Sequence, residues 1–350
     1  MLPGGGRSSG VRSSPGPPTW CAAAGEGTAA TVGAEVGDAS AMQRIVGPAD
    51  LILARHRNRA GNDRVLQRAA ERGELTRLRS GAYVATTIWQ ALPQDDRRRL
   101  EAAAMAEMHP SFVASHRSAA ALWRVPTIRR PDGLVHARVG VAAGTRTEHG
   151  VRKHAVHEVD LHVTVVDGIA CTTLERTVLD LAATEQFDEA VVALDWALAQ
   201  GVGKDRLREV LDEWGPARGR RPVEAALEFA DGASGSPGES LSRVQIADAG
   251  LPVPVLQQAF HDRRGLIGHV DFWWPDFGLI GEFDGLIKYR EPEILAGRTP
   301  AQVVVAEKVR EDRLRATATH PRLQRWVWAT LSARGALASA LQLAGLPRLR

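Results

Sequence analysis

Two acidic residues of this 350-residue chain occupy facing positions in a hairpin expected near its C-terminal end. The turn residues Pro275–Gly278 separate two apolar runs that read as strands. If these residues form the turn, Trp274 pairs with Leu279, and Asp271 then lies opposite Glu282. Side chains that face each other across a strand pair share one side of the sheet. The spacing therefore predicts two carboxylates at one site.

A third acid, Asp284, lies two residues beyond Glu282 and is expected on the same side of the sheet. Like charges on adjacent strands destabilise a sheet unless a cation or a raised pKa compensates. Hard carboxylate oxygens suit Mg²⁺ or Mn²⁺, which polarise bound water for attack on a phosphodiester. We therefore predict a Mg²⁺ or Mn²⁺ site with Asp271 and Glu282 as its ligands.

Three further residues are candidates for this chemistry. Glu239 could contact the metal or its water, although it also completes a capping box that begins at Ser236. Lys288 and Lys308 could orient the attacking water or neutralise charge in the transition state. Lys308 could instead pair with Asp312, four residues further along a helix. Both interpretations of Glu239 and of Lys308 stand at this point.

The histidines offer a weaker metal signal. His154 and His157 are three residues apart, a spacing found in some metal sites. The sequence shows no convincing third ligand beside them. We therefore expect no metal there.

Composition limits the class of protein. The chain is 44% apolar and 24% charged, which suits folded domains and excludes global disorder. No window is apolar enough for a membrane span, so no membrane partner is expected. Cys21 and Cys171 lie far apart without a CxxC pattern, which argues against a disulfide framework or structural zinc and favours the cytoplasm.

The candidate site falls within a predicted C-terminal domain, residues 237–350, which follows a Gly/Ser-rich linker at 231–236. Its pattern predicts a small α/β sandwich. The expected elements are helices at 237–249, 300–316 and 331–343, and strands at 253–261, 266–274, 279–284 and 323–328.

Residues 236–332 resemble a known nuclease group. The segments SPGES, HVDFWWP, GEFDGLIKY, AEKVREDRLRA and RWVW occur in order, as in the very-short-patch-repair-like endonucleases of the PD-(D/E)xK superfamily. The resemblance implies a restriction-endonuclease-like fold, with Asp271 and Glu282 as metal ligands and Glu239 as the helix acid. The superfamily places a lysine where this chain has Asp284, so the lysine would have moved to Lys288 or Lys308, or activity would be lost.

The N-terminal part reads as a small DNA-binding module. Residues 1–48 are rich in Gly, Ala, Ser and Pro and are predicted to be a disordered tail, with Met42 as an alternative translation start to Met1. Residues 49–90 predict two short helices and a two-stranded wing around Ser80-Gly81, with Leu78 opposite Tyr83. This order indicates a winged helix-turn-helix.

The middle region, residues 91–230, mixes helices and strands. Strands are expected at 134–139 and 161–166, and helices after Ser115, from a capping box at Thr172–Glu175 and over 187–198 and 207–214. No catalytic spacing occurs among these residues.

Residues 50–90, together with SHRSAAALW and TTLERTVLD, resemble the AbiEi antitoxin family of type IV toxin-antitoxin systems. The resemblance implies a winged helix-turn-helix on double-stranded operator DNA, an α/β antitoxin-type domain and a cognate toxin as a partner. Arg64 and Arg68 would lie on the groove-facing helix, and Arg77 and Arg79 would contact phosphates from the wing.

The sequence therefore predicts an α/β multidomain protein of the cytoplasm that acts on DNA. In the first hypothesis it is a Mg²⁺-dependent DNA endonuclease that hydrolyses phosphodiester bonds. In the competing hypothesis it is a non-enzymatic AbiEi-type regulator with an inactive nuclease fold. A small-molecule hydrolase ranks below both, because the chain has no phosphate-binding Gly-rich loop and no nucleophile elbow.

Overall fold

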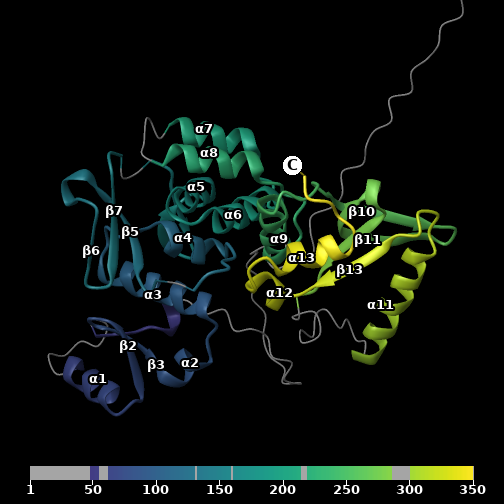
Figure 1. The fold of residues 1–350 in the computed structure, drawn as a ribbon. Helices are drawn as coiled ribbons and strands as arrows, with labels where there is room; N and C mark the ends of the chain where they lie inside the picture. Colours follow the sequence, from purple (N-terminus) through teal and green to yellow (C-terminus); the bar gives the residue numbers. More distant parts are fainter. Residues whose placement is uncertain are drawn as a thin grey trace, which may run out of the picture.

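The computed structural model describes residues 48–54, 62–130, 132–158, 161–213, 219–285 and 300–349. These residues form mixed α/β structure with three sheets (Figure 1). Lys288 lies outside the described residues, as does the expected tail at 1–48 apart from its last residue. No helix of the described part is long and apolar enough to cross a membrane.

Before its hairpin, the described part of the N-terminal unit contains one helix rather than the two expected. Helix α1 (Asn62–Glu71) is followed by β2 (Leu75–Arg79), β3 (Ala82–Ala85) and α2 (Thr86–Ala91). Upstream, a 3-10 turn at Pro48–Asp50 leads into β1 (Ile52–Leu53), which pairs with β3. The helix expected from Leu51 is therefore wrong where the structure describes it. As a strand, β1 forms backbone hydrogen bonds with β3 at the edge of the hairpin, and Leu53 is buried.

The hairpin of this unit has an irregular register. Arg77 pairs with Tyr83 and Arg79 with Ala82, so a bulge at Leu78 separates the two pairs. The expected pairing of Leu78 with Tyr83 is wrong, because the bulge adds a residue to one strand only. One helix and a three-stranded sheet do not establish the predicted winged helix-turn-helix.

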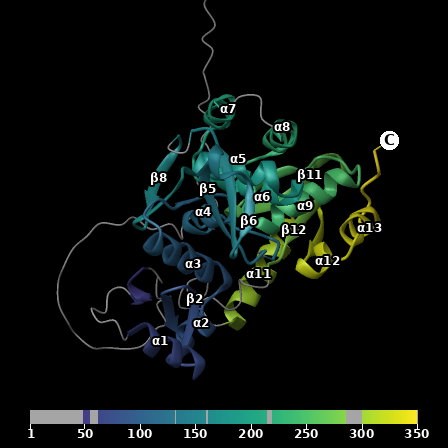
Figure 2. The ribbon, with the colours of Figure 1, turned by 90° about the vertical axis from the view of Figure 1, so that its left-hand side faces the viewer.

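Helix α3 (Gln94–Met108) connects the first two sheets. Leu100 packs with Val84 of the small N-terminal sheet, whereas Ala102 and Ala103 pack in the core of the middle sheet. In Figures 1 and 2, α3 lies between the N-terminal unit and the middle of the molecule. A single helix therefore serves both cores.

The middle unit contains a six-stranded mixed sheet of order β6-β7-β5-β4-β9-β8. Its strands are β4 (Val113–Ala114), β5 (Val135–Gly140), β6 (Arg146–Glu148), β7 (Val151–Val156), β8 (Val163–Val166) and β9 (Ile169–Thr172). Both strands expected from the sequence, at 134–139 and 161–166, are confirmed as β5 and β8.

Helices α4 to α8 form the rest of this unit and enclose its largest apolar core. They are α4 (His116–Trp123), α5 (Leu174–Thr184), α6 (Phe187–Ala199), α7 (Lys204–Asp212) and α8 (Arg220–Phe229). The capping box expected from Thr172 to Glu175 is wrong by one residue, because the N-cap of α5 is Thr173, whose hydroxyl accepts a hydrogen bond from the Arg176 backbone N–H.

The expected linker at 231–236 is firmly attached to the middle unit. The Asp231 backbone N–H donates to Asp195 Oδ1 at 2.7 Å, and Arg243 Nη1 donates to Asp195 Oδ2 at 2.7 Å. Asp195 lies on α6 and Arg243 lies on α9 (Pro237–Asp248), and the two helices pack together. The buried Asp195 carboxylate therefore joins the middle and C-terminal units.

The C-terminal unit has the expected order of helix, three strands, helix and strand. After α9 come β10 (Val255–Asp262), β11 (Gly265–Trp274), β12 (Leu279–Phe283), α11 (Pro300–Arg315), β13 (Arg322–Trp326), α12 (Trp328–Ser332) and α13 (Ala336–Leu343). The sheet order is β10-β11-β12-β13, and only β12 and β13 are parallel.

Helices cover both faces of this sheet (Figure 1). Phe272, Trp274 and Trp326 pack with residues of α9, α12 and α13, whereas Trp273 and Ile280 pack with Leu314 of α11. This arrangement confirms the α/β sandwich. The single helix expected at 331–343 is wrong, because a break at Gly335 with a positive φ of 74° separates α12 from α13.

Candidate functional site

The predicted register of the acidic hairpin is confirmed. Trp274 pairs with Leu279 and Phe272 with Gly281, which places Asp271 next in line opposite Glu282. The regular pairing of β11 with β12 ends at this point, and the Phe283 backbone N–H donates to Asp271 Oδ2 at 2.8 Å. The Asp271 carboxylate thus accepts the hydrogen bond of the Phe283 N–H in place of a backbone carbonyl.

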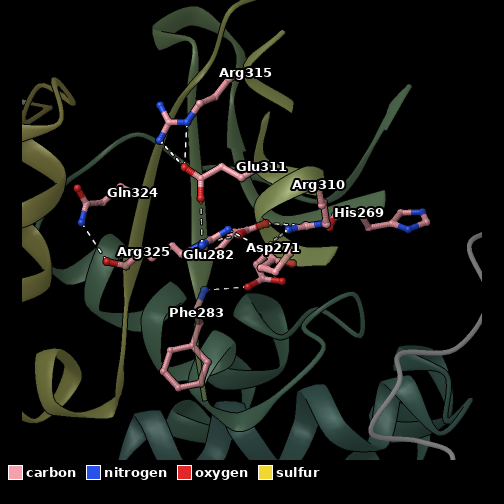
Figure 3. A network of polar contacts seen from close by, with 10 residues as sticks. His269, Asp271, Glu282, Phe283, Arg310, Glu311, Arg315, Gln324 and Arg325 are labelled. Atoms are coloured by element: carbon pink, nitrogen blue, oxygen red, sulfur yellow. Dashed lines mark hydrogen bonds and ion pairs between the residues drawn. The ribbon is translucent and has the colours of Figure 1, made fainter. Parts of the chain in front are cut away.

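Glu282 is held between two guanidinium groups (Figure 3). Arg310 of α11 donates to Glu282 Oε1 at 2.6 Å, and Arg325 of β13 donates to Oε2 at 3.0 Å. Arg325 is the cross-strand partner of Glu282 in the parallel pair. The Glu282 side chain is buried, so these arginines compensate a charge that water does not reach.

The charge network continues along α11 (Figure 3). Glu307 pairs with Arg310 at 3.0 Å and with Arg325 at 2.5 Å, and Glu311 pairs with Arg325 at 3.2 Å. Burial lowers the pKa of Arg310 and of Arg325, but their contacts with Glu282 and Glu307 outweigh burial and raise both pKa values. The network fastens α11 to the sheet.

Glu239 caps the start of α9. Its backbone N–H donates to Ser236 Oγ, while Glu239 Oε1 accepts from the Ser236 hydroxyl at 2.8 Å and Oε2 accepts from the Gly235 N–H at 2.7 Å. The capping interpretation of this residue is therefore confirmed.

Gln257 of β10 connects Glu239 with Asp271. Its Nε2 donates to Glu239 Oε2 at 2.9 Å and to Asp271 Oδ1 at 3.4 Å. No local pattern singled out Gln257, which has a positive φ of 47° and lies between Leu256 and Gln258, two residues of β10 that pair with β11. Arg310 and Arg325 were also missed, because their contact with Glu282 depends on how α11 and β13 pack.

All six carboxylate oxygens of Glu239, Asp271 and Glu282 accept hydrogen bonds from protein donors. Among the described residues, the only group of three metal-ligating side chains close enough to share an ion consists of histidines elsewhere. The acidic residues, as arranged here, do not fit the Mg²⁺ or Mn²⁺ ion predicted from the sequence.

The remaining predicted residues lie apart from this network. Asp284 follows the end of β12, and its backbone N–H donates to the Trp326 carbonyl at 2.8 Å. Lys308 is exposed on α11, next to Glu307 in the chain. The hydrogen bonds described above for Asp271 and Glu282 come from other residues.

The predicted DNA-binding arginines fall into two groups. Arg64 and Arg68 on α1 and Arg77 on β2 are exposed. Arg79 is half-buried and donates to the carbonyls of His149 and Gly150, at 2.7 and 3.0 Å. Burial lowers the pKa of Arg79. In this arrangement Arg79 contacts the middle unit, and its contact with phosphate stays a prediction.

A cluster of three histidines lies in the middle unit. His154 was expected to stand near His157 without a third ligand, but it instead meets His116 and His136. The His116 and His154 rings stack with centroids 3.5 Å apart. Three separate elements contribute these residues, so no spacing along the chain could have revealed the cluster.

Burial affects the protonation of this cluster. It lowers the pKa of His154 to about 3, and it also lowers the pKa values of His116 and His136. The three imidazoles are therefore neutral at pH 7. His116 and His154 line a cavity of about 340 Å³, together with Arg138, Arg176 and Asp180.

Comparison with known proteins gives two relatives and no family. No protein-family model matches the sequence. The chain is similar to uncharacterized proteins MT2308 and Rv2248 of Mycobacterium tuberculosis, from strains CDC 1551 / Oshkosh and ATCC 25618 / H37Rv. Each is 34% identical over 139 residues, which cover 38% of this chain and 50% of the relative. The chain spans about half the length of the curated relatives it matches.

Proposed function

We propose that this chain is a DNA-binding regulator whose nuclease-like C-terminal unit does not hydrolyse DNA. One observation carries the second half of the proposal: Arg310 and Arg325 each donate to one carboxylate oxygen of Glu282, so two cations already contact the acid that a metal would need. Metal-assisted hydrolysis needs carboxylates that can bind an ion with open positions for water and substrate. Here guanidinium groups neutralise Glu282 instead.

Exposed positive charge supports the first half. Arg64 and Arg68 are four residues apart on α1 and so lie on the same side of that helix. Arg77 projects from β2, which contacts α1. Exposed arginines on neighbouring elements can contact successive phosphates of a duplex. The resemblance to AbiEi antitoxins adds operator DNA and a toxin as the partners in this proposal.

A salt titration of DNA binding tests this surface. We expect the full chain to bind a short mixed-sequence duplex in EDTA, and an Arg64→Ala/Arg68→Ala variant to bind more weakly at low salt. Each lost phosphate contact should reduce the slope of log K against log salt by about 1. An Arg206→Ala/Arg208→Ala variant is the matched control, because it removes two exposed charges from α7. Equal binding by all three proteins would contradict the proposal.

A second candidate is the Mg²⁺-dependent endonuclease. The contacts through Gln257 favour it, because they bring the helix acid Glu239 close to Asp271 beside the confirmed hairpin register. This function would require Arg310 and Arg325 to release Glu282 when DNA binds.

A further inference from the structure

Three elements of the middle unit bring the histidine cluster together. His136 lies on β5, His154 lies on the parallel neighbour β7, and His116 begins α4. One ring nitrogen from each residue lies within 4.8 Å of the others. His116 has a positive φ of 46°, which is uncommon for a residue with a side chain. Such strain persists only where the surrounding structure holds it.

The hydrogen bonds identify which nitrogen of each ring faces the centre of the cluster. His136 Nε2 lies 3.1 Å from Asp132 Oδ2, and a carboxylate can only accept, so Nε2 carries the hydrogen. The lone pair of His136 Nδ1 then faces His154 Nε2, 3.0 Å away. His116 Nδ1 lies 3.1 Å from Ser115 Oγ, which leaves Nε2 of His116 for the centre.

We propose that His116, His136 and His154 form a binding site for a divalent transition metal of the zinc class. The ion takes the place of the hydrogen between His154 Nε2 and His136 Nδ1, and that hydrogen moves to Nδ1 of His154, so all three ligands are neutral imidazoles. Two nitrogens bound to the same tetrahedral zinc lie about 3.3 Å apart, so this pair has to separate by only a few tenths of an ångström. An all-nitrogen ligand set suits zinc, cobalt, nickel or copper and does not suit Mg²⁺.

The surroundings supply what such a site needs. Asp132 fixes the tautomer of His136, and His116 Nδ1 has Ser115 and, at 3.8 Å, Asp180 beside it. Partners of this kind orient imidazole ligands and strengthen metal binding. Asp180 also offsets the positive charge of Arg138 and Arg176 around the cavity.

The cavity beside the histidines determines whether a bound ion has an open coordination position. His116 and His154 line the cavity, so the ion has an open position on that side. Three protein ligands with an open position are typical of sites where a metal binds water or substrate. The His116 and His154 rings are stacked at an interplanar angle of 15°. Binding turns these rings apart, because each must aim a lone pair at the ion.

Metal titration of the untagged, chelator-treated full chain tests the proposal. We expect equimolar Zn²⁺ to bind, excess Mg²⁺ not to displace it, and Co²⁺ to give visible absorption bands of nitrogen ligation. A His136→Gln/His154→Gln variant should lose this metal, and Asp132→Asn should weaken binding by about 10- to 100-fold. His157→Gln is the matched control, because His157 lines the same cavity without joining the cluster.

Two outcomes would overturn the proposal. One is a wild-type chain that takes up no Zn²⁺ or Co²⁺, a result that does not depend on whether the variants fold. The other is a folded His136→Gln/His154→Gln variant, checked by circular dichroism, that binds as much metal as wild type. Neither outcome bears on DNA binding by α1. The metal site and the proposed function are therefore tested independently.

Discussion

Glu282 illustrates how this sheet tolerates acids at facing positions. Acids at facing positions need a compensating cation or a raised pKa, and here two guanidinium groups and a backbone N–H contact Glu282 and Asp271. Arg325 reaches Glu282 from the neighbouring parallel strand and Arg310 reaches it from α11. The compensation is therefore internal to the fold.

Neutralising Glu282 should destabilise the C-terminal unit. In Glu282→Gln, Arg310 and Arg325 lose a charged acceptor in a largely buried place, which should cost about 1–3 kcal/mol of unfolding free energy. Urea unfolding followed by tryptophan fluorescence measures this change. Asp284→Asn is the control, with an expected change below about 0.5 kcal/mol. Equal stability of both variants and wild type would mean that the network does not support the fold.

Some site residues could be predicted from local pattern and others could not. Ser236 and Glu239 follow a capping rule that acts within one turn of helix, and the hairpin register follows from its turn. The histidine cluster and the arginines at Glu282 depend on contacts between elements far apart in sequence. No period or spacing along the chain encodes such contacts.

At the scale of elements, the C-terminal unit was predicted more accurately than the N-terminal one. Long apolar strands between clear turn residues define β10, β11 and β12. The two-residue strand β1 is too short to show a period, and the bulge at Leu78 has no sequence signature. A short edge strand forms because it pairs with a neighbouring strand. The β propensity of its own residues therefore does not determine where it forms.

The pair of Asp262 and Arg313 attaches α11 to β10 and should depend on pH. Both Asp262 oxygens accept from Arg313 at 2.8 Å, and this contact lowers the pKa of Asp262 to about 2. Because the folded-state pKa lies below the unfolded value, the stabilisation is present above about pH 4 and is lost as pH falls towards 2. Carboxyl NMR titration should show this low pKa.

Replacing the arginine gives the control for that titration. In Arg313→Gln, the pKa of Asp262 should return towards the ordinary value of 3.8. An unchanged pKa in this variant would show that Arg313 is not the cause of the shift.

At the scale of the whole molecule, a few charged contacts connect the units. Arg79 joins the N-terminal hairpin to the turn between β6 and β7, and Asp195 joins α6 to α9. The units also share α3, whose residues pack in two cores. These contacts explain why the segment at 231–236 is not a free linker.

Removing Arg243 should weaken the connection between the middle and C-terminal units. Arg243→Ala leaves the buried Asp195 carboxylate without its cation, which should cost about 3 kcal/mol at neutral pH. Burial raises the pKa of Asp195, and loss of Arg243 should raise it further. The folded variant then binds a proton more readily than the unfolded chain, so its deficit should shrink as pH falls towards the raised pKa of Asp195.

Urea unfolding of this variant at several pH values gives the measurement. Arg206→Ala, at an exposed position on α7, is the control and should change stability little at any pH. A deficit that stays constant with pH would contradict the assignment of Asp195 as the group left unpaired.

Cleavage of supercoiled plasmid tests the central claim most directly. Purified full chain is incubated with DNA in Mg²⁺, Mn²⁺ or EDTA, beside an Asp271→Asn/Glu282→Gln variant that circular dichroism shows to be folded. We expect that neither protein nicks the plasmid in any metal, while both retard DNA in a gel without metal. Metal-dependent nicking by wild type that the variant lacks would contradict it and establish the endonuclease.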